Sequence, residues 1–239
     1  MTPRYILEIS VESVEAALAA ERGGADRLEL CANLREGGTT PPAELLRSVR
    51  ERVRLPIFAM IRPRGGNFLY SDGEFAAMRE AIHAARESGA DGFVLGLLDA
   101  QGRVDVERTR ELVERASPLP VTFHRAFDAC VDLRSALDDV IKTGATRVLT
   151  SGGKPTAPEA FSMLGELVRS AGERIVVMPG SGLHAGNIGE AVEATGAREY
   201  HAGLSSVASQ AGGDLDGFER EVRKMVAALR AAAASKKVQ

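Results

Sequence analysis

The chain carries the same Gly-Ala phrase four times, each time directly before a short run of apolar and β-branched residues. The phrase occurs at Gly24-Ala25, Gly89-Ala90, Gly144-Ala145 and Gly196-Ala197. A glycine behind an amphipathic stretch is typical of a helix end, because glycine can take the left-handed backbone conformation there. The apolar run that follows predicts a strand buried on both faces. The phrase therefore predicts four helix-to-strand junctions.

Four further apolar runs complete a set of eight predicted strands. One run comes before the first phrase, and one lies in each interval between phrases. The strands are expected to begin near residues 5, 26, 56, 91, 119, 146, 174 and 198. Eight alternating βα units in 239 residues predict a (β/α)8 TIM barrel of the α/β class. We expect one domain over residues 1–239, with a C-terminal helix near 218–234, where good helix formers dominate.

Capping residues mark several of the predicted helices. Ser71, with Glu74 three positions later, has the spacing of a capping box at the start of a helix over 71–88. Asp132 is expected to cap the start of another helix. The glycine-rich stretch 202–217 is expected to be a loop after the eighth strand.

Composition and charge argue against several classes of partner. A hydrophobic content of 44% allows a large core, and a net charge of −3 gives no reason to expect nucleic acid or an anionic membrane. No apolar run approaches the roughly 18 residues of a membrane span, and the N-terminus lacks the apolar core of a signal peptide. Cys31 and Cys130 are isolated, so we expect a reducing, cytoplasmic setting. No motif implies an organic cofactor.

Charged side chains stand where the predicted strands end. The candidate catalytic residues are Glu8, Glu29, Arg62, His124, Arg125 and Asp128. The carboxyl ends of barrel strands form the mouth that carries the active site in this fold. Arginine suits an anion there, and glutamate or histidine suits proton transfer. We expect the first four residues to lie within a few ångströms of each other, with Arg62 beside a glutamate. The alternatives are an ion network that only fills the barrel, and a core histidine at position 124.

Two glycine-rich turns extend this mouth. The candidate anion-binding residues are Ser151, Gly152, Gly180, Ser181, Gly182 and His201. Such turns expose backbone N–H groups, and the loops after strands seven and eight are the usual phosphate site of this fold. A small anionic ligand is therefore expected, although the glycines could serve only to make tight turns.

The stretch 62–73 after the third strand is long for a βα turn. It contains two arginines and two aromatic residues. Long ordered loops in compact domains often cover or bind a ligand. The sequence leaves two interpretations open for this loop: a lid over a polar ligand, or a contact within a homo-oligomer.

Several long strings closely resemble the CutC family of copper homeostasis proteins. They are ADRLELC, EGGTTP, IRPRGGNFLYSDGE, PVTFHRAFD and RVLTSGG, and the resemblance runs from about residue 5 to about residue 205. Members of the family are (β/α)8 barrels. The resemblance implies a cytoplasmic protein that acts in copper homeostasis and binds copper(I).

The chain departs from that family at two positions. Members commonly carry cysteine where this chain has Ser10 and Ala202, which leaves Cys31 as the candidate metal ligand. Copper(I) prefers two or more soft ligands, and only Met60 and Met178 could add to Cys31. An inert core residue is the favoured interpretation of Cys31.

Two classes of function therefore stay open. One is a copper-binding protein, and the other is an enzyme acting on a small anionic or phosphorylated metabolite. A scaffold without catalytic activity would leave the charged mouth unexplained. The physics of the sequence favours the enzyme, because the charged set is complete and the soft-ligand set is not.

Overall fold

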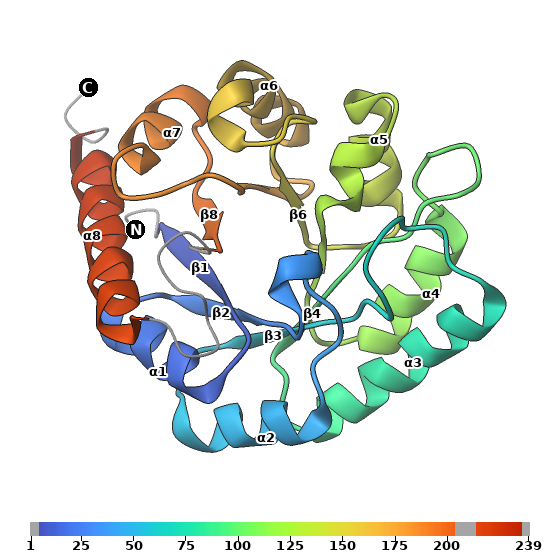
Figure 1. The fold of residues 1–239 in the computed structure, drawn as a ribbon. Helices are drawn as coiled ribbons and strands as arrows, with labels where there is room; N and C mark the ends of the chain where they lie inside the picture. Colours follow the sequence, from blue (N-terminus) through green and yellow to red (C-terminus); the bar gives the residue numbers. More distant parts are fainter. Residues whose placement is uncertain (1–4, 204–213, 236–239) are drawn as a thin grey trace.

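The computed structural model describes residues 5–203 and 214–235. Within them, eight parallel strands alternate with helices around a barrel (Figure 1). The strands are β1 Ile6–Val11, β2 Arg27–Leu30, β3 Ile57–Met60, β4 Gly92–Leu95, β5 Val121–Phe123, β6 Arg147–Thr150, β7 Val176–Pro179 and β8 Glu199–Ala202. Each strand begins within two residues of its predicted start, and the (β/α)8 fold is confirmed.

In the part of the chain that the structure describes, eight α-helices surround the strands. They are α1 Val14–Gly23, α2 Ala43–Arg52, α3 Asp72–Glu87, α4 Val106–Ala116, α5 Leu133–Lys142, α6 Phe161–Ala171, α7 Ile188–Thr195 and α8 Leu215–Ser235. Three short 3-10 helices, η1 Leu34–Glu36, η2 Arg125–Ala129 and η3 Ala157–Ala160, lie in the loops after strands. None of the helices in the described ranges is long and apolar enough to cross a membrane.

The helix ends follow the chemistry that the sequence predicted. Gly24, Gly89, Gly144 and Gly196 all have positive φ angles, between 70° and 91°, and each lies within two residues of a helix end. The capping box is also present, since Ser71 Oγ accepts the Glu74 N–H at 3.3 Å. Helix α8 begins three residues before its predicted start. Most of the predicted loop at 202–217, from 204 to 213, lies outside the described residues.

The strands pair in the order β7-β6-β5-β4-β3-β2-β1-β8. Glu8 on β1 is therefore the register partner of Arg27 on β2 and of His201 on β8. The two ends of this order come together, because a Cβ at Gly180, just after β7, would lie 3.1 Å from the Cβ of His201 on β8. The barrel thus closes between β7 and β8, beside His201.

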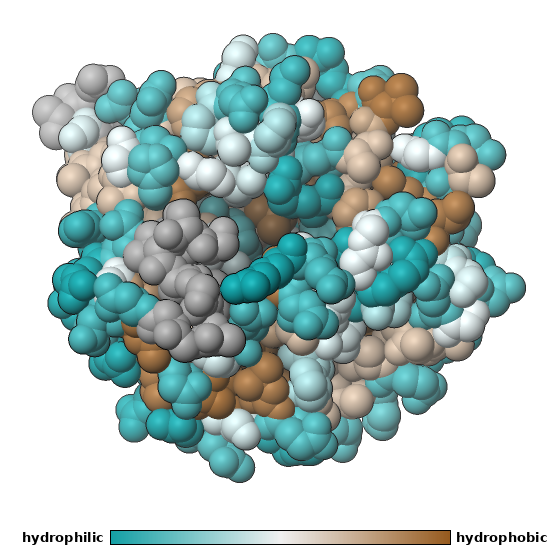
Figure 2. Space-filling model, in the orientation of Figure 1, coloured by the Kyte–Doolittle hydropathy of each residue, from teal (hydrophilic) through white to brown (hydrophobic). Residues whose placement is uncertain are grey.

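The strands separate an apolar outer layer from a polar barrel interior. Leu7, Ile9, Leu28 and Leu30 belong to the large apolar core that includes residues of the surrounding helices. The alternate positions of the same strands carry Glu8 and the other charged groups inside the barrel. Figure 2 shows that hydrophilic residues dominate the face onto which Figure 1 looks, with a hollow near its centre.

Candidate functional site

A cavity of about 530 Å³ opens at the carboxyl ends of the strands. It has the size of a small-molecule site. The predicted site residues that line it are Glu29, Arg62, His124, Arg125, Ser181, Gly182 and His201. Seven positions on or just after five strands thus share one cavity. The other predicted residues, Glu8, Cys31, Asp128, Ser151, Gly152 and Gly180, lie behind its lining.

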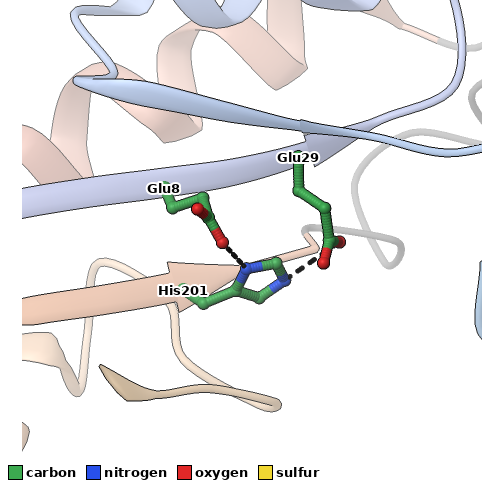
Figure 3. Close-up of side chains that lie close together, drawn as sticks. All are labelled: Glu8, Glu29 and His201. Carbon is green, nitrogen blue, oxygen red and sulfur yellow. Dashed lines mark hydrogen bonds and ion pairs between the residues drawn. The ribbon is translucent and has the colours of Figure 1, made fainter. Parts of the chain in front are cut away.

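Two residues of the cavity wall, Glu29 and His201, form a row of titratable side chains with Glu8, which lies behind them (Figure 3). Glu8 comes from β1, Glu29 from β2 and His201 from β8. His201 lies between the two carboxylates, with Nδ1 2.8 Å from Glu8 Oε1 and Nε2 3.8 Å from Glu29 Oε2. Glu8 is the third of six residues in β1, so the prediction that it ends the strand was wrong. Its side chain lies behind His201, inside the barrel.

The two carboxyl groups of this row have opposite electrostatic environments. Burial alone would raise the pKa of Glu8, but the Arg27 guanidinium and the His201 ring outweigh it and hold that pKa well below its usual range. Burial raises the pKa of Glu29, and the charge of Glu8 adds to this despite the opposing effect of His201. For His201, the two carboxylates outweigh burial and raise the pKa. The two carboxylates therefore favour the charged form of His201, whereas burial and Glu8 disfavour the charged form of Glu29.

An ion network beneath this row was missing from the sequence prediction. Arg27 contacts Glu8 and also pairs with Glu199 at 2.7 Å, and Glu199 pairs with Arg147 at 2.6 Å. A signal for it was present, because Arg27 and Glu199 stand two positions before Glu29 and His201. Alternate residues of a strand face the same side, so they had to share the barrel interior. Positive and negative groups thus alternate from Arg147 to His201.

Arg62 lies elsewhere on the cavity wall than predicted. Its guanidinium donates to the carbonyl oxygens of Glu36 at 3.1 Å, Gly38 at 2.9 Å and Gly66 at 2.9 Å. The expectation that it pairs with a glutamate was wrong, because its donors are used to tie two loops together. Among the described residues, it has no carboxylate within ion-pair distance. Arg62 is therefore a buried cation, 5% exposed, without a counter-ion in residues 5–203 and 214–235.

His124 lies beside this cation with one ring nitrogen unused. Its Nδ1 accepts the N–H of Ala126 at 3.1 Å, whereas Nε2 is buried and has no partner in the described part of the chain. Phe68 packs against the ring at 5.1 Å and also stacks under Arg62. Burial and the Arg62 charge lower the pKa of His124 to about 3. The ring is thus neutral, and since Nδ1 is an acceptor, Nε2 carries the hydrogen.

The loop after β3 folds around a second arginine. Arg64 pairs with Glu74 at 2.6 Å and donates to the carbonyl oxygens of Asn67 and Leu69. This arrangement places Phe68 on the cavity wall. Because Phe68 lies on the cavity wall, the structure favours the interpretation in which this loop contacts a ligand. The contact within an oligomer stays a prediction.

The glycine turn after β6 differs from the expectation of an open anion site. The Asp128 carboxylate accepts the N–H groups of Ser151 at 3.0 Å and Gly153 at 3.0 Å, and the Thr150 hydroxyl donates to it at 2.5 Å. The N–H of Gly152 donates to Thr150 Oγ1. The Asp128 carboxylate thus occupies the place in this turn where an anion was expected, and it stabilises the turn. The backbone N–H groups of Ser151 and Gly152 are both used within the protein and are not available to a ligand.

The turn after β7 remains on the cavity wall. Ser181 has a φ of +75°, a conformation that is uncommon for a residue with a side chain, and its hydroxyl donates to the Pro155 carbonyl at 2.9 Å. Gly180 already donates its N–H to Thr150. Nearby, Arg125 pairs with Asp128 at 2.9 Å and remains partly exposed in the cavity. Of the predicted anion-binding residues, Ser181, Gly182 and His201 therefore remain on the cavity wall, together with Arg62 and Arg125.

Comparison with known proteins identifies the family. A family model described as the CutC family matches residues 5–206. The chain belongs to the CutC family. The copper homeostasis protein cutC homolog of Homo sapiens is 48% identical over 202 residues, covering 84% of this chain and 74% of that protein. A family protein CutC of Chromobacterium violaceum is 50% identical over 197 residues, covering 82% and 80%.

Solved structures agree with this assignment. The crystal structure of a CutC protein from Streptococcus agalactiae superposes with a TM-score of 0.78 at 32% identity, covering 83% of this chain and 98% of that one. A thiamine phosphate pyrophosphorylase from Pyrococcus furiosus has a TM-score of 0.65 at 18% identity, covering 97% and 98%. The second likeness shows only that the two proteins share the barrel fold.

The donor set of this CutC protein does not fit copper(I). Cys31 is fully buried and donates its S–H to Glu29 Oε2 at 3.6 Å, and burial together with the Glu29 charge raises its pKa well above the usual value. Of the other soft donors, Met60 packs in the same small cluster as Cys31. Ser10 and Ala202 provide no sulfur. One protonated thiol with one thioether is a poor site for a soft ion.

The row of Glu8, Glu29 and His201 has its ligand atoms within 4.8 Å of one another and could hold a metal ion. Its oxygen and nitrogen donors suit harder ions than copper(I). Both Glu8 oxygens are already engaged, one by Arg27 and one by His201. We therefore interpret Glu8, Glu29 and His201 as residues that bind and release protons, and not as metal ligands.

Proposed function

We propose that this CutC protein acts in copper homeostasis by binding and converting a small anionic molecule at the barrel mouth, rather than by carrying copper(I) on Cys31. The names of its relatives support the role in copper homeostasis. The composition of the cavity wall supports the ligand class. An enzyme and a copper binder would use different parts of the site, so the two can be separated by experiment.

The observation that carries the proposal is the buried Arg62. A guanidinium removed from water is costly unless a negative charge lies beside it. The three carbonyl oxygens that Arg62 contacts satisfy hydrogen bonds but bring no net charge. A small anion in the cavity would supply that charge, with Arg125 as a second cation at the rim. A phosphorylated metabolite fits the cavity volume of about 530 Å³.

Binding of 2-phosphoglycolate, measured by calorimetry, tests the ligand class. We expect binding by the wild type, a loss of at least about tenfold in Arg125→Met, and a larger loss in Arg62→Met. Arg230→Met, an exposed position on α8, is the matched control and should bind like the wild type. Circular dichroism establishes that each variant is folded. Equal affinity in Arg125→Met, Arg62→Met and the control would contradict the proposal.

Anaerobic titration with a copper(I) competitor probe tests the alternative. We expect weak copper(I) binding by the wild type and no change in Cys31→Ser, because the thiol is buried and protonated. Ser10→Cys adds a second soft ligand at the cavity wall and should tighten binding. Tight stoichiometric binding by the wild type that is lost in Cys31→Ser would instead make this a copper-binding protein.

The cellular setting is part of the same proposal. The isolated cysteines suit a reducing, cytoplasmic compartment, and the net charge of −3 argues against nucleic acid and membrane surfaces as partners. A homo-oligomer stays a prediction that light scattering in solution would test.

A further inference from the structure

We propose that Glu29 and His124 are the catalytic pair for a proton transfer at a carbon atom next to a carbonyl group, in a hydroxy-carbonyl anion of the sugar phosphate type. The inference rests on the proposed function, because the anion must first bind at the mouth. It adds a reaction class and a role for each of two residues. Both side chains line the one cavity, Glu29 from β2 and His124 from the end of β5.

His124 is built to donate a hydrogen bond without carrying a charge. The Ala126 N–H occupies Nδ1, so the hydrogen resides on Nε2, which is buried and unpartnered in the described residues. The ring cannot turn easily, because it lies against β4: a Cβ at Gly96 would be 2.5 Å from Nδ1. A fixed neutral N–H donor can hold a carbonyl oxygen and stabilise the negative charge that develops on it.

Glu29 offers a carboxylate oxygen that no side chain or backbone group of the described residues uses. Its Oε2 accepts the Cys31 S–H and faces His201, whereas Oε1 is buried without a partner among the described residues. The side chain is only 4% exposed, so an unused oxygen there is costly unless a ligand meets it. A buried carboxylate on a cavity wall is a suitable base for a carbon-bound proton.

The residues behind Glu29 position it and tune its charge. His201 lies between Glu29 and Glu8, and Arg27 holds Glu8 from below. This chain of alternating charges fixes the imidazole of His201 beside Glu29. We assign His201 and Glu8 as positioning residues, because Glu8 does not reach the cavity and His201 acts through Glu29.

The reaction needs no oxidant, reductant or other co-reactant. Glu29 takes the proton from the carbon next to the carbonyl, and the C–H electron pair becomes a C=C bond. The π electrons of the carbonyl move to its oxygen, which accepts a hydrogen bond from His124 Nε2. For an isomerisation, the hydroxyl on the carbon that lost its proton passes its own proton to the former carbonyl oxygen, so that a new C=O bond forms there as Glu29 returns its proton to the former carbonyl carbon. When the proton on Glu29 is first replaced by one from solvent and then returns to the original carbon, the net result is exchange of that hydrogen with solvent.

Solvent hydrogen exchange measures this step directly. Dihydroxyacetone phosphate and ribulose 5-phosphate serve as probes in D2O, and proton NMR follows loss of the C–H signal next to the carbonyl. We expect the wild type to exchange at least one probe faster than buffer does. Glu29→Gln should lose about 10²- to 10⁴-fold in rate, and His124→Gln about 10²- to 10³-fold, while calorimetry still shows binding of the probe.

Matched controls are Glu80→Gln and His83→Gln, both exposed on α3, which should exchange at the wild-type rate. Thermal unfolding of each variant separates a catalytic effect from a folding defect. Binding of the probes without exchange by the wild type would overturn this inference and leave the proposed function standing. Failure of both probes and of 2-phosphoglycolate to bind would overturn this inference and the proposed function together. An unchanged exchange rate in folded Glu29→Gln or His124→Gln would show that other residues catalyse the exchange.

Discussion

Single buried charges in this barrel are held by specific partners, and the exceptions lie on the cavity wall. Arg27 is 6% exposed and contacts two carboxylates, whereas Arg62 is equally buried and contacts none in the described part of the chain. Glu8 has both oxygens engaged, whereas Glu29 has one oxygen free. Of the seven buried side-chain atoms without a hydrogen-bond partner among the described residues, those of Glu29, Arg62 and His124 therefore lie where a ligand can reach them.

The buried ion network should contribute strongly to stability. Arg27→Met leaves Glu8 without its main counter-ion and should lower the free energy of unfolding by about 3–5 kcal/mol. Arg22→Met breaks the exposed pair with Glu219 and should cost at most about 1 kcal/mol. Urea unfolding of both variants checks this, and equal losses would show that the interior network is no stronger than a surface pair.

The neutral state of His124 predicts a pH dependence of stability. Its folded pKa of about 3 lies below the unfolded value near 6.5, so the unfolded chain binds more protons in that window. Stability from this group is complete above pH 6.5 and is lost as the pH falls. Between pH 7.5 and 5 the loss should be about 2 kcal/mol. Urea unfolding of wild type and His124→Gln at both pH values measures it, and identical pH slopes would contradict a neutral, buried ring.

Helix α8 covers the barrel by packing on α1, and one glycine permits the close approach. A Cβ at Gly23 would lie 2.7 Å from Val222 Cβ on α8. Figure 1 shows the two helices next to each other at the edge of the barrel, near β1. Gly23, directly before the Gly24-Ala25 phrase, therefore permits helix packing, whereas Gly24 ends the helix. The sequence did not predict this role, because it depends on a helix about 200 residues away.

Two glycine substitutions should have opposite effects on helix stability. Gly23→Ala forces α1 and α8 apart and should destabilise the protein by about 1–3 kcal/mol. Gly73→Ala lies in the first turn of α3 with no atom within 4 Å of the new methyl group, and should stabilise it by about 0.5–1 kcal/mol. Differential scanning calorimetry distinguishes them. A melting temperature that changes in the same direction for both would contradict the packing argument.

At the scale of the whole molecule, local signals predicted the barrel well and its site only in part. The Gly-Ala phrase is a local feature, so it located the strands, and strand ends correctly pointed to Glu29, His124 and His201 on one cavity. The partners of Arg62 and Asp128 were not predictable, because both are set by loop conformations. Glu8 lies further inside the barrel than predicted, because its position is set by the pairing register of β1 with its neighbours. Local sequence patterns do not reveal that register. Arg27 and Glu199 were missed although strand alternation placed them beside the site.

The central claim is that the barrel mouth binds an anion against Arg62 while neutral His124 donates from Nε2. Nitrogen NMR of histidine-labelled protein, titrated with 2-phosphoglycolate between pH 6 and 8, tests this most directly. We expect His124 to be neutral and protonated on Nε2 throughout, and we expect the probe to shift its Nε2 signal but to leave the signals of exposed His83 unchanged. A His124 ring that titrates near pH 6.5, or an Nε2 signal that saturating probe does not move, would contradict it.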